Sequence, residues 1–233
     1  MNRDEETREI GSKGAIGDPV DSPNSDILLN GLALAAQIFW GPEPELCRDM
    51  VRGEFRADLE ALGPYLNAGG QESIRRMRAW VLDRDDDRVC PELEDEYLRL
   101  FVNAREGLKA PLYHSHYESA DGTLMGRPFR MMTGLFREIG IDPAEVTPEP
   151  ADHLSMELEY LFLLLEAGTG RDRPDLLPAA LEFARNQMLP WLRKMVRRLV
   201  EMDNPDTFYI PAAELVMALL EAVSSIPAPD PVS

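Results

Sequence analysis

One segment of the chain is apolar on every side of the helix that it predicts. It runs from Asp152 to Ala167 and contains the unbroken apolar stretch Tyr160–Leu165. Pro150 disfavours helical geometry just before it, so this helix is expected to begin soon after the proline. A helix that is apolar all round has to be enclosed by other elements. The segment therefore predicts the central helix of a larger helical protein.

The rest of the chain also follows helical spacing, and no stretch shows the alternation typical of a half-buried strand. Pro91 is expected in the first turn of its helix, after an acidic turn over 83–87. Pro190 predicts either two helices over 174–200 or one helix kinked there. The further helices are expected over residues 26–40, 44–62, 71–82, 92–101, 128–140, 174–200 and 204–223. Glycines and prolines between residues 103 and 126 predict a long loop, and long loops tend to be functional. The prolines between 143 and 150 predict a stiff connector.

These elements predict one all-α domain. The expected fold is a single-domain helical bundle over residues 26–225, with the long functional loop before the central helices. Residues 1–25 are polar and predict a disordered N-terminal segment. Residues 226–233 contain three prolines and predict a loose C-terminal tail.

The charge balance narrows the class of partner. The chain carries 42 Asp and Glu against 24 Lys and Arg, a formal net charge of −18. Nucleic acid is not expected as a partner, because phosphate contacts need basic side chains. A basic peptide or a cationic segment of another protein is the better electrostatic match, although acidity can also serve solubility alone. The basic residues from Arg193 to Arg198 are expected to form an outer face that pairs partly with the chain's own acids.

Cysteine content and hydropathy bear on the compartment. Cys47 and Cys90 are too few for a disulfide framework or a zinc site, so each is expected as a small apolar side chain under reducing conditions. The longest apolar run has six residues, far below the roughly 20 that a membrane span requires. The N-terminus lacks the apolar core of a signal peptide. The expected location is the cytoplasm, without stable membrane insertion.

Asp152 and His153 form an acid–imidazole pair at the start of the central helix. The simplest interpretation makes Asp152 the N-cap and His153 a solvated residue of the first turn. His114 and His116 could bind a metal, with Glu118 or His153 completing the site, and a site that includes His153 would give a helical metal-dependent hydrolase. A triad of Ser115, His153 and Asp152 is disfavoured, because adjacent residues on a helix point about 100° apart. A purely structural adaptor is a further alternative.

Four segments, taken in order, resemble the TorD/DmsD/NarJ family of cytoplasmic redox-enzyme maturation chaperones. The family patterns are aromatic-x-x-Leu-Phe-Val, a proline-rich loop ending in Ser-x-aromatic, Pro-x-Asp-His, and Pro-Trp followed by Phe-Tyr. The matching segments are Glu96–Val102, Ala110–Tyr117, Glu149–Leu154, and Leu189–Trp191 with Phe208–Tyr209. The resemblance covers residues 27 to 222.

The resemblance implies a TorD-like all-helical fold and a chaperone without catalytic turnover. Such a chaperone binds the twin-arginine signal peptide or N-terminal tail of a molybdenum oxidoreductase catalytic subunit until the cofactor is inserted, and it prevents premature export. The bis-molybdopterin guanine dinucleotide belongs to the client, so no stably bound cofactor is expected. Weak guanine-nucleotide binding is known in the family, but Gln187 stands where members often have a histidine. The expected oligomeric state is a monomer or a domain-swapped dimer.

The resemblance also implies which residues bind the peptide. The acid-rich surface suits arginine guanidinium groups, while Leu112 and the tyrosines of the loop suit an apolar stretch. The residues carried over are Pro150, Asp152 and His153, together with Phe101, Pro111, Tyr113, Ser115 and Tyr117 along the same groove.

Overall fold

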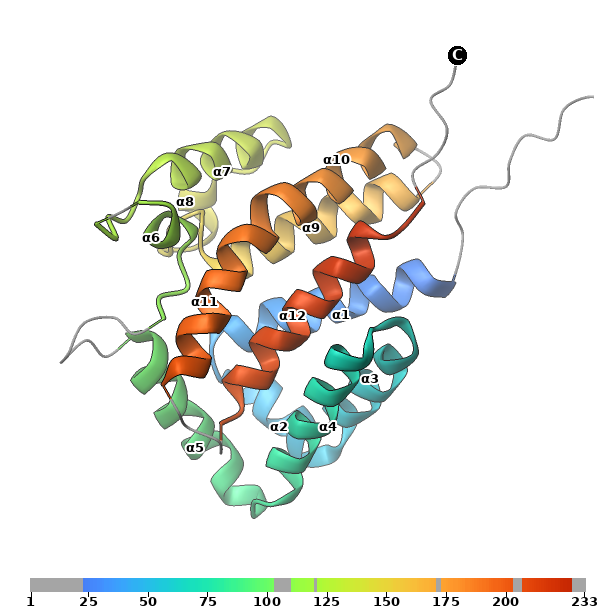
Figure 1. The fold of residues 1–233 in the computed structure, drawn as a ribbon, viewed down its shortest axis with the longest axis vertical. Helices are drawn as coiled ribbons and strands as arrows, with labels where there is room; N and C mark the ends of the chain where they lie inside the picture. Colours follow the sequence, from blue (N-terminus) through green and yellow to red (C-terminus); the bar gives the residue numbers. More distant parts are fainter. Residues whose placement is uncertain (1–22, 103–109, 120, 171–172, 203–206, 228–233) are drawn as a thin grey trace, which may run out of the picture.

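The computed structural model describes residues 23–102, 110–119, 121–170, 173–202 and 207–227, and these residues fold into a helical bundle (Figure 1). In chain order the elements are α1 (Pro23–Trp40), α2 (Pro44–Arg52), α3 (Glu54–Leu62), η1 (Gly63–Tyr65), α4 (Ala68–Leu82), α5 (Asp86–Tyr97), η2 (Leu98–Val102), α6 (His114–Glu118), α7 (Arg127–Glu138), α8 (Pro143–Val146), α9 (Leu154–Thr169), η3 (Pro174–Leu176), α10 (Leu177–Glu182), η4 (Phe183–Met188), α11 (Leu189–Glu201) and α12 (Tyr209–Ser224). Within the described ranges the β-type pairing is one isolated bridge. The predicted all-α class is confirmed.

The central helix is α9, as its composition predicts. It packs against α1 and α10, and its inward leucines are fully buried. Helix α12, equally apolar, lies against α1, α4 and α11 (Figure 1). Helices α6, α7 and α8 gather beside the first turns of α9, at one corner of the bundle. This corner is the part of the fold that positions the candidate site.

Two helix boundaries differ from the sequence prediction. The expected helix over 44–62 is two helices, because Gly53 adopts a φ of +97° between them, a conformation open mainly to glycine. Helix α5 begins at Asp86 rather than after Pro91, so this proline lies inside the helix. The acidic turn expected over 83–87 is present over 83–85, and its last two residues, Asp86 and Asp87, form the first turn of α5, where carboxylates are favourable beside the helix N-terminus.

The predicted loop and connector are partly helical. Residues 114–118 of the loop form α6, which contacts α7 and α11, and residues 143–146 of the connector form α8. The loop residues 103–109 and 120 lie outside the described residues, as do 1–22 and 228–233 of the expected terminal segments. Helix α1 starts at Pro23, three residues before its expected start.

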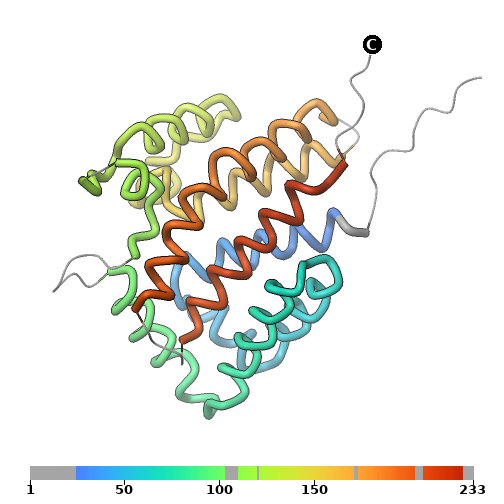
Figure 2. The backbone as a smooth tube through the Cα atoms, viewed as in Figure 1, coloured from blue at the N-terminus to red at the C-terminus, as the bar shows by residue number. Residues whose placement is uncertain are grey.

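Pro190 changes the helix type and leaves its course nearly straight. In Figure 2 the chain passes from α10 through η4 into α11 as one long rod. The six residues of η4, just before the proline, are π-helical. A proline lacks the amide hydrogen and its ring collides with the carbonyl one turn back. The wider π turn accommodates both effects. Of the two arrangements expected around Pro190, the structure has two α-helices, α10 and α11, joined through η4 without a sharp kink.

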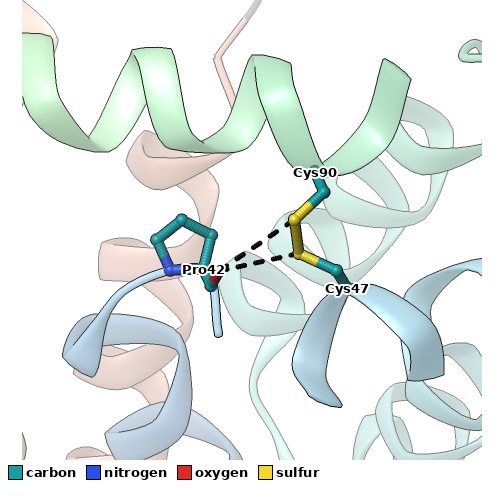
Figure 3. The surroundings of a disulfide bond; sticks show 3 residues. All are labelled: Pro42, Cys47 and Cys90. Atoms are coloured by element: carbon teal, nitrogen blue, oxygen red, sulfur yellow. Dashed lines mark hydrogen bonds between the residues drawn. A yellow bond between two sulfur atoms is a disulfide. The ribbon is translucent and has the colours of Figure 1, made fainter. Parts of the chain in front are cut away.

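A disulfide joins Cys47 of α2 to Cys90 of α5, with 5.4 Å between their Cα atoms (Figure 3). Both sulfurs face the carbonyl oxygen of Pro42, at 3.8 and 4.0 Å. The expectation of two separate reduced thiols was therefore wrong. It failed because the packing of α2 on α5, which brings together residues 43 positions apart, leaves no local mark in the sequence. No described helix is long and apolar enough to cross a membrane.

Candidate functional site

Two of the four sequence motifs pair directly. The His114 amide donates to the Asp152 carbonyl at 3.0 Å, and the Leu154 amide donates to the Leu112 carbonyl at 2.8 Å. These bonds form an antiparallel bridge between Tyr113 and His153, here called the 113–153 bridge. The proline-rich loop is thus fixed against the first residues of α9.

Asp152 does not cap the helix that follows it. Its side chain is fully buried, and its Oδ2 accepts a hydrogen bond from the Ser115 amide at 2.9 Å. This bond satisfies one of the free amides at the start of α6. The other oxygen, Oδ1, has no hydrogen-bond partner among the described residues. Asp152 therefore anchors the loop to the bridge, and the prediction that it caps α9 was wrong.

His153 is the N-cap of α9 and is not solvated. Its side chain is 3% exposed, and its Nδ1 accepts a hydrogen bond from the Ser155 amide at 3.3 Å. The ring stacks on Trp40 at 5.1 Å and meets the edge of Tyr113 at 5.4 Å. Burial lowers the pKa of His153 to about 4, so the imidazole is neutral at pH 7 with its proton on Nε2. The expected solvated histidine is therefore a buried neutral ring.

A buried polar cluster joins the Pro-Trp motif to the bridge. Glu157 lies one turn into α9, fully buried, and its Oε2 accepts the indole proton of Trp191 at 2.9 Å. Its Oε1 lies 2.8 Å from Nδ1 of His114, whose ring stacks on Trp191. Burial raises the pKa of Glu157, against the lowering effect of its two partners. Glu157 links α6, α9 and α11 through side chains alone.

The first motif packs mainly against the Phe-Tyr motif. Phe101 is buried against Phe39 and Tyr209. Glu96, from the same motif, accepts the Phe208 and Tyr209 amides at 3.1 and 3.2 Å, and so caps the start of α12. The motif also reaches the proline-rich loop, because the Ala110 amide donates to the Leu100 carbonyl at 3.4 Å.

Several partly exposed side chains form the surface beside the 113–153 bridge. The Tyr113 hydroxyl donates to Glu149 at 2.7 Å, and the Trp40 indole donates to Glu159 at 2.6 Å. Next to Glu149, a cavity of about 280 Å³ lies between α7, α8 and the start of the bridge. Its lining is Met125, Phe129, Thr133, Arg137, Asp142, Pro143, Ala144, Thr147, Pro148, Glu149, Pro150 and Ala151. A larger cavity of about 690 Å³ lies between α1, η1 and α12 and contains none of the predicted site residues.

The predicted site residues divide by exposure. Pro150 and Tyr113 reach the surface. The buried members are Phe101, Pro111, Ser115, Tyr117, Asp152 and His153. Leu112 and Tyr117, expected to offer apolar surface, also lie in the core, which contradicts that expectation. Direct peptide contact stays a prediction, and in this conformation the buried residues shape the site from beneath.

Sequence reasoning missed Trp40, Glu157 and Glu159. The two glutamates are the earliest acids in an otherwise apolar helix, and that was a usable signal. Trp40 ends α1 just before Gly41, and nothing local indicated that its ring would meet His153.

The three histidines have separate environments. His116 lies between the Gly122 carbonyl at 3.1 Å and the Arg198 guanidinium at 2.6 Å, so its Nδ1 donates and its Nε2 accepts. Within the part of the chain that the structure describes, no group of three or more His, Cys, Asp or Glu residues could hold a metal ion.

The chain is similar to named proteins and to a solved structure. The chaperone protein TorD of Vibrio parahaemolyticus is 28% identical over 201 residues, covering 82% of this chain and 93% of that protein. TorD of Photobacterium profundum is 27% identical over 200 residues, covering 80% and 90%. A crystal structure from Archaeoglobus fulgidus, provisionally described as a redox enzyme maturation protein, superposes with a TM-score of 0.51 at 20% identity, over 92% of this chain and 99% of that one.

Both TorD relatives are named as chaperones. The model of one family matches residues 54–197, more than half of the chain, and includes the bridge, the Glu157 cluster and the Pro-Trp motif. The chain belongs to this family, the nitrate reductase delta subunit family, which is the TorD/NarJ group that the four motifs resemble.

Proposed function

We propose that this chaperone acts in the cytoplasm on the catalytic subunit of a molybdenum oxidoreductase. It binds the twin-arginine leader or N-terminal tail of that subunit while the molybdopterin cofactor is inserted, and it delays export. The named relatives and the acidic balance support this function, since a negatively charged chaperone attracts a basic leader.

The observation that carries the proposal is the surface around Pro150. Glu149 and Pro150 line the cavity together with Met125 and Phe129, and the Tyr113 hydroxyl donates to Glu149. A leader peptide combines a basic end with an apolar stretch. Carboxylates suit the first and an apolar groove suits the second. Both chemistries lie next to each other on this surface.

Asp152 and His153 have a positioning role in this proposal. Asp152 fixes the start of α6 and His153 fixes the start of α9, so together they set the distance between Tyr113 and α9. Their substitution is therefore expected to reduce peptide binding and stability together. The cofactor remains with the client, and weak guanine-nucleotide binding and a monomer or domain-swapped dimer stay predictions.

The test is calorimetric titration with a synthetic leader peptide from the client candidate, at low salt. Met125→Glu places a charge at the groove, where this side chain is 57% exposed, and should weaken binding about tenfold. The matched control is Val200→Glu, a 51% exposed apolar side chain on α11 outside the groove, which should leave affinity unchanged. Absence of binding to the unmodified protein, or equal loss in both variants, would contradict the proposed site.

A further inference from the structure

Two aromatic–carboxylate pairs flank one buried neutral ring. Trp40 holds Glu159, and Tyr113 holds Glu149, through the hydrogen bonds of 2.6 and 2.7 Å. Both aromatic rings contact His153, one by stacking and one by its edge. Both pairs therefore contact the same imidazole. We call the surface formed by Trp40, Glu159, Tyr113 and Glu149 the paired-carboxylate patch.

Each carboxylate in the paired-carboxylate patch can still accept further hydrogen bonds. Glu159 accepts the Trp40 indole proton on Oε1, and Glu149 accepts the Tyr113 hydroxyl proton on Oε2. The other oxygen of each carboxylate has no hydrogen-bond partner among the described residues. None of the ion pairs found between described residues involves Glu149 or Glu159, whereas the partly exposed Glu214, Glu92 and Glu118 are each paired with an arginine. All four side chains of the patch are partly exposed. The patch therefore presents negative charge on aromatic surface without an internal cation.

The surroundings of the paired-carboxylate patch add negative charge. Asp152, fully buried with an unpartnered oxygen, acts electrostatically on the Tyr113 hydroxyl, as Glu149 does. The same Glu149 charge, together with burial, raises the pKa of Tyr97 to about 12. His153 contributes no positive charge at neutral pH because it is held neutral. A cation entering this patch meets the two partly exposed carboxylates, while Arg137, which lines the same cavity as Glu149, is paired with Asp142 at 3.2 Å.

The shape of the patch selects among cations. A guanidinium is planar, stacks on indole and phenol faces, and donates two parallel hydrogen bonds to a carboxylate. An ammonium group is a compact point charge and cannot do both at once. We propose that the two pairs bind two guanidinium groups of neighbouring arginines, one at Trp40–Glu159 and one at Tyr113–Glu149. This inference rests on the proposed function and names the part of the leader that the paired-carboxylate patch recognises.

The experiment uses three synthetic leader peptides that differ only at two adjacent positions, which hold arginine, lysine or citrulline. Citrulline keeps the planar shape and loses the charge. Binding to the full chain should weaken about tenfold with lysine and about a hundredfold with citrulline, as expected for the loss of charged hydrogen bonds. Titration calorimetry measures all three. Equal affinity for the arginine and citrulline peptides would overturn the inference.

Variants assign the effect to the two pairs. Glu149→Gln and Glu159→Gln should each weaken the arginine peptide about tenfold and leave the citrulline peptide unchanged. The control is Glu166→Gln, which removes the same charge from an exposed position two turns further along α9. Trp40→Phe removes the donor that orients Glu159 and keeps a stacking face. Thermal unfolding checks that every variant is folded.

The outcomes separate this inference from the proposed function. If the arginine peptide does not bind the unmodified protein, the proposed function fails. If it binds, and the Glu149 and Glu159 variants behave like the Glu166 control, the proposed function stands and the assignment of the paired-carboxylate patch is wrong.

Discussion

Reduction of the Cys47–Cys90 disulfide is expected to lower the free energy of unfolding by about 4 kcal/mol. The bond closes a loop with a sequence separation of 43 residues. Opening it lets the unfolded chain explore conformations that the cross-link forbids. The chain-entropy relation gives about 13 cal/mol/K for a loop of this length, which is about 4 kcal/mol at 25 °C. For a chain of this size the same loss corresponds to a fall of about 10 °C in the melting temperature.

The assay compares urea unfolding of the oxidised protein with and without a phosphine reductant, followed by circular dichroism at 222 nm. A thiol titration in denaturant should find no free thiol before reduction and two after it. The double variant Cys47→Ser, Cys90→Ser is the control, and its unfolding should not respond to the reductant. Two free thiols in the untreated protein would refute the pairing. A stability difference below about 1 kcal/mol would refute the entropic reasoning.

Three further perturbations probe the core of the site. Glu157→Ala leaves a buried indole and a buried imidazole unpartnered and should cost about 3–5 kcal/mol in urea unfolding, whereas Glu166→Ala on the exposed side of α9 should cost less than about 0.5. Because His153 has its pKa lowered to about 4, the unfolded state binds the extra proton, so stability should fall by up to about 3 kcal/mol as pH drops from 6.5 to 4. His153→Asn keeps a capping acceptor and should remove that fall in stability. Glu157, whose pKa is raised, changes the stability with the opposite sign in both proteins. Identical pH profiles of stability for the two proteins would contradict the assignment of the fall to His153. Gly168→Ala should destabilise the protein by more than about 1 kcal/mol, since the added Cβ would lie 2.5 Å from the backbone nitrogen of Leu177. The control Gly134→Ala has open space around its Cβ and should be neutral or stabilising by about 0.5–1 kcal/mol.

The helical class and the central helix could be predicted from the sequence, because a helix that is apolar all round has to be enclosed by other helices. Helix ends were harder to place. Gly53, with its positive φ, divides the helix expected over 44–62, and Pro91, expected in a first turn, lies further inside α5. Neither boundary follows from the apolar spacing alone, because that spacing continues through both residues.

The motifs predicted the neighbourhood of the site better than the roles of its residues. Asp152 and His153 do lie at the start of α9, but their capping roles are not those expected, and both are buried. Burial of His153 depends on Trp40, which is 113 positions earlier in the chain. The disulfide depends on the same kind of distant packing. Such contacts are set by the assembled bundle, so they cannot be inferred from spacing within one segment.

The 113–153 bridge has a consequence for how this fold can vary. It fixes both ends of the stretch from Ser115 to Asp152 to each other by backbone bonds, independently of what the stretch contains. Helices α7 and α8, which line the groove beside Pro150, belong to this stretch. The exposed positions of these helices can change without moving the start of α9, whereas Met132 and Phe136 of α7 are buried in the core. Two chaperones could therefore share one scaffold and still differ on this exposed face, and so in the clients that they accept.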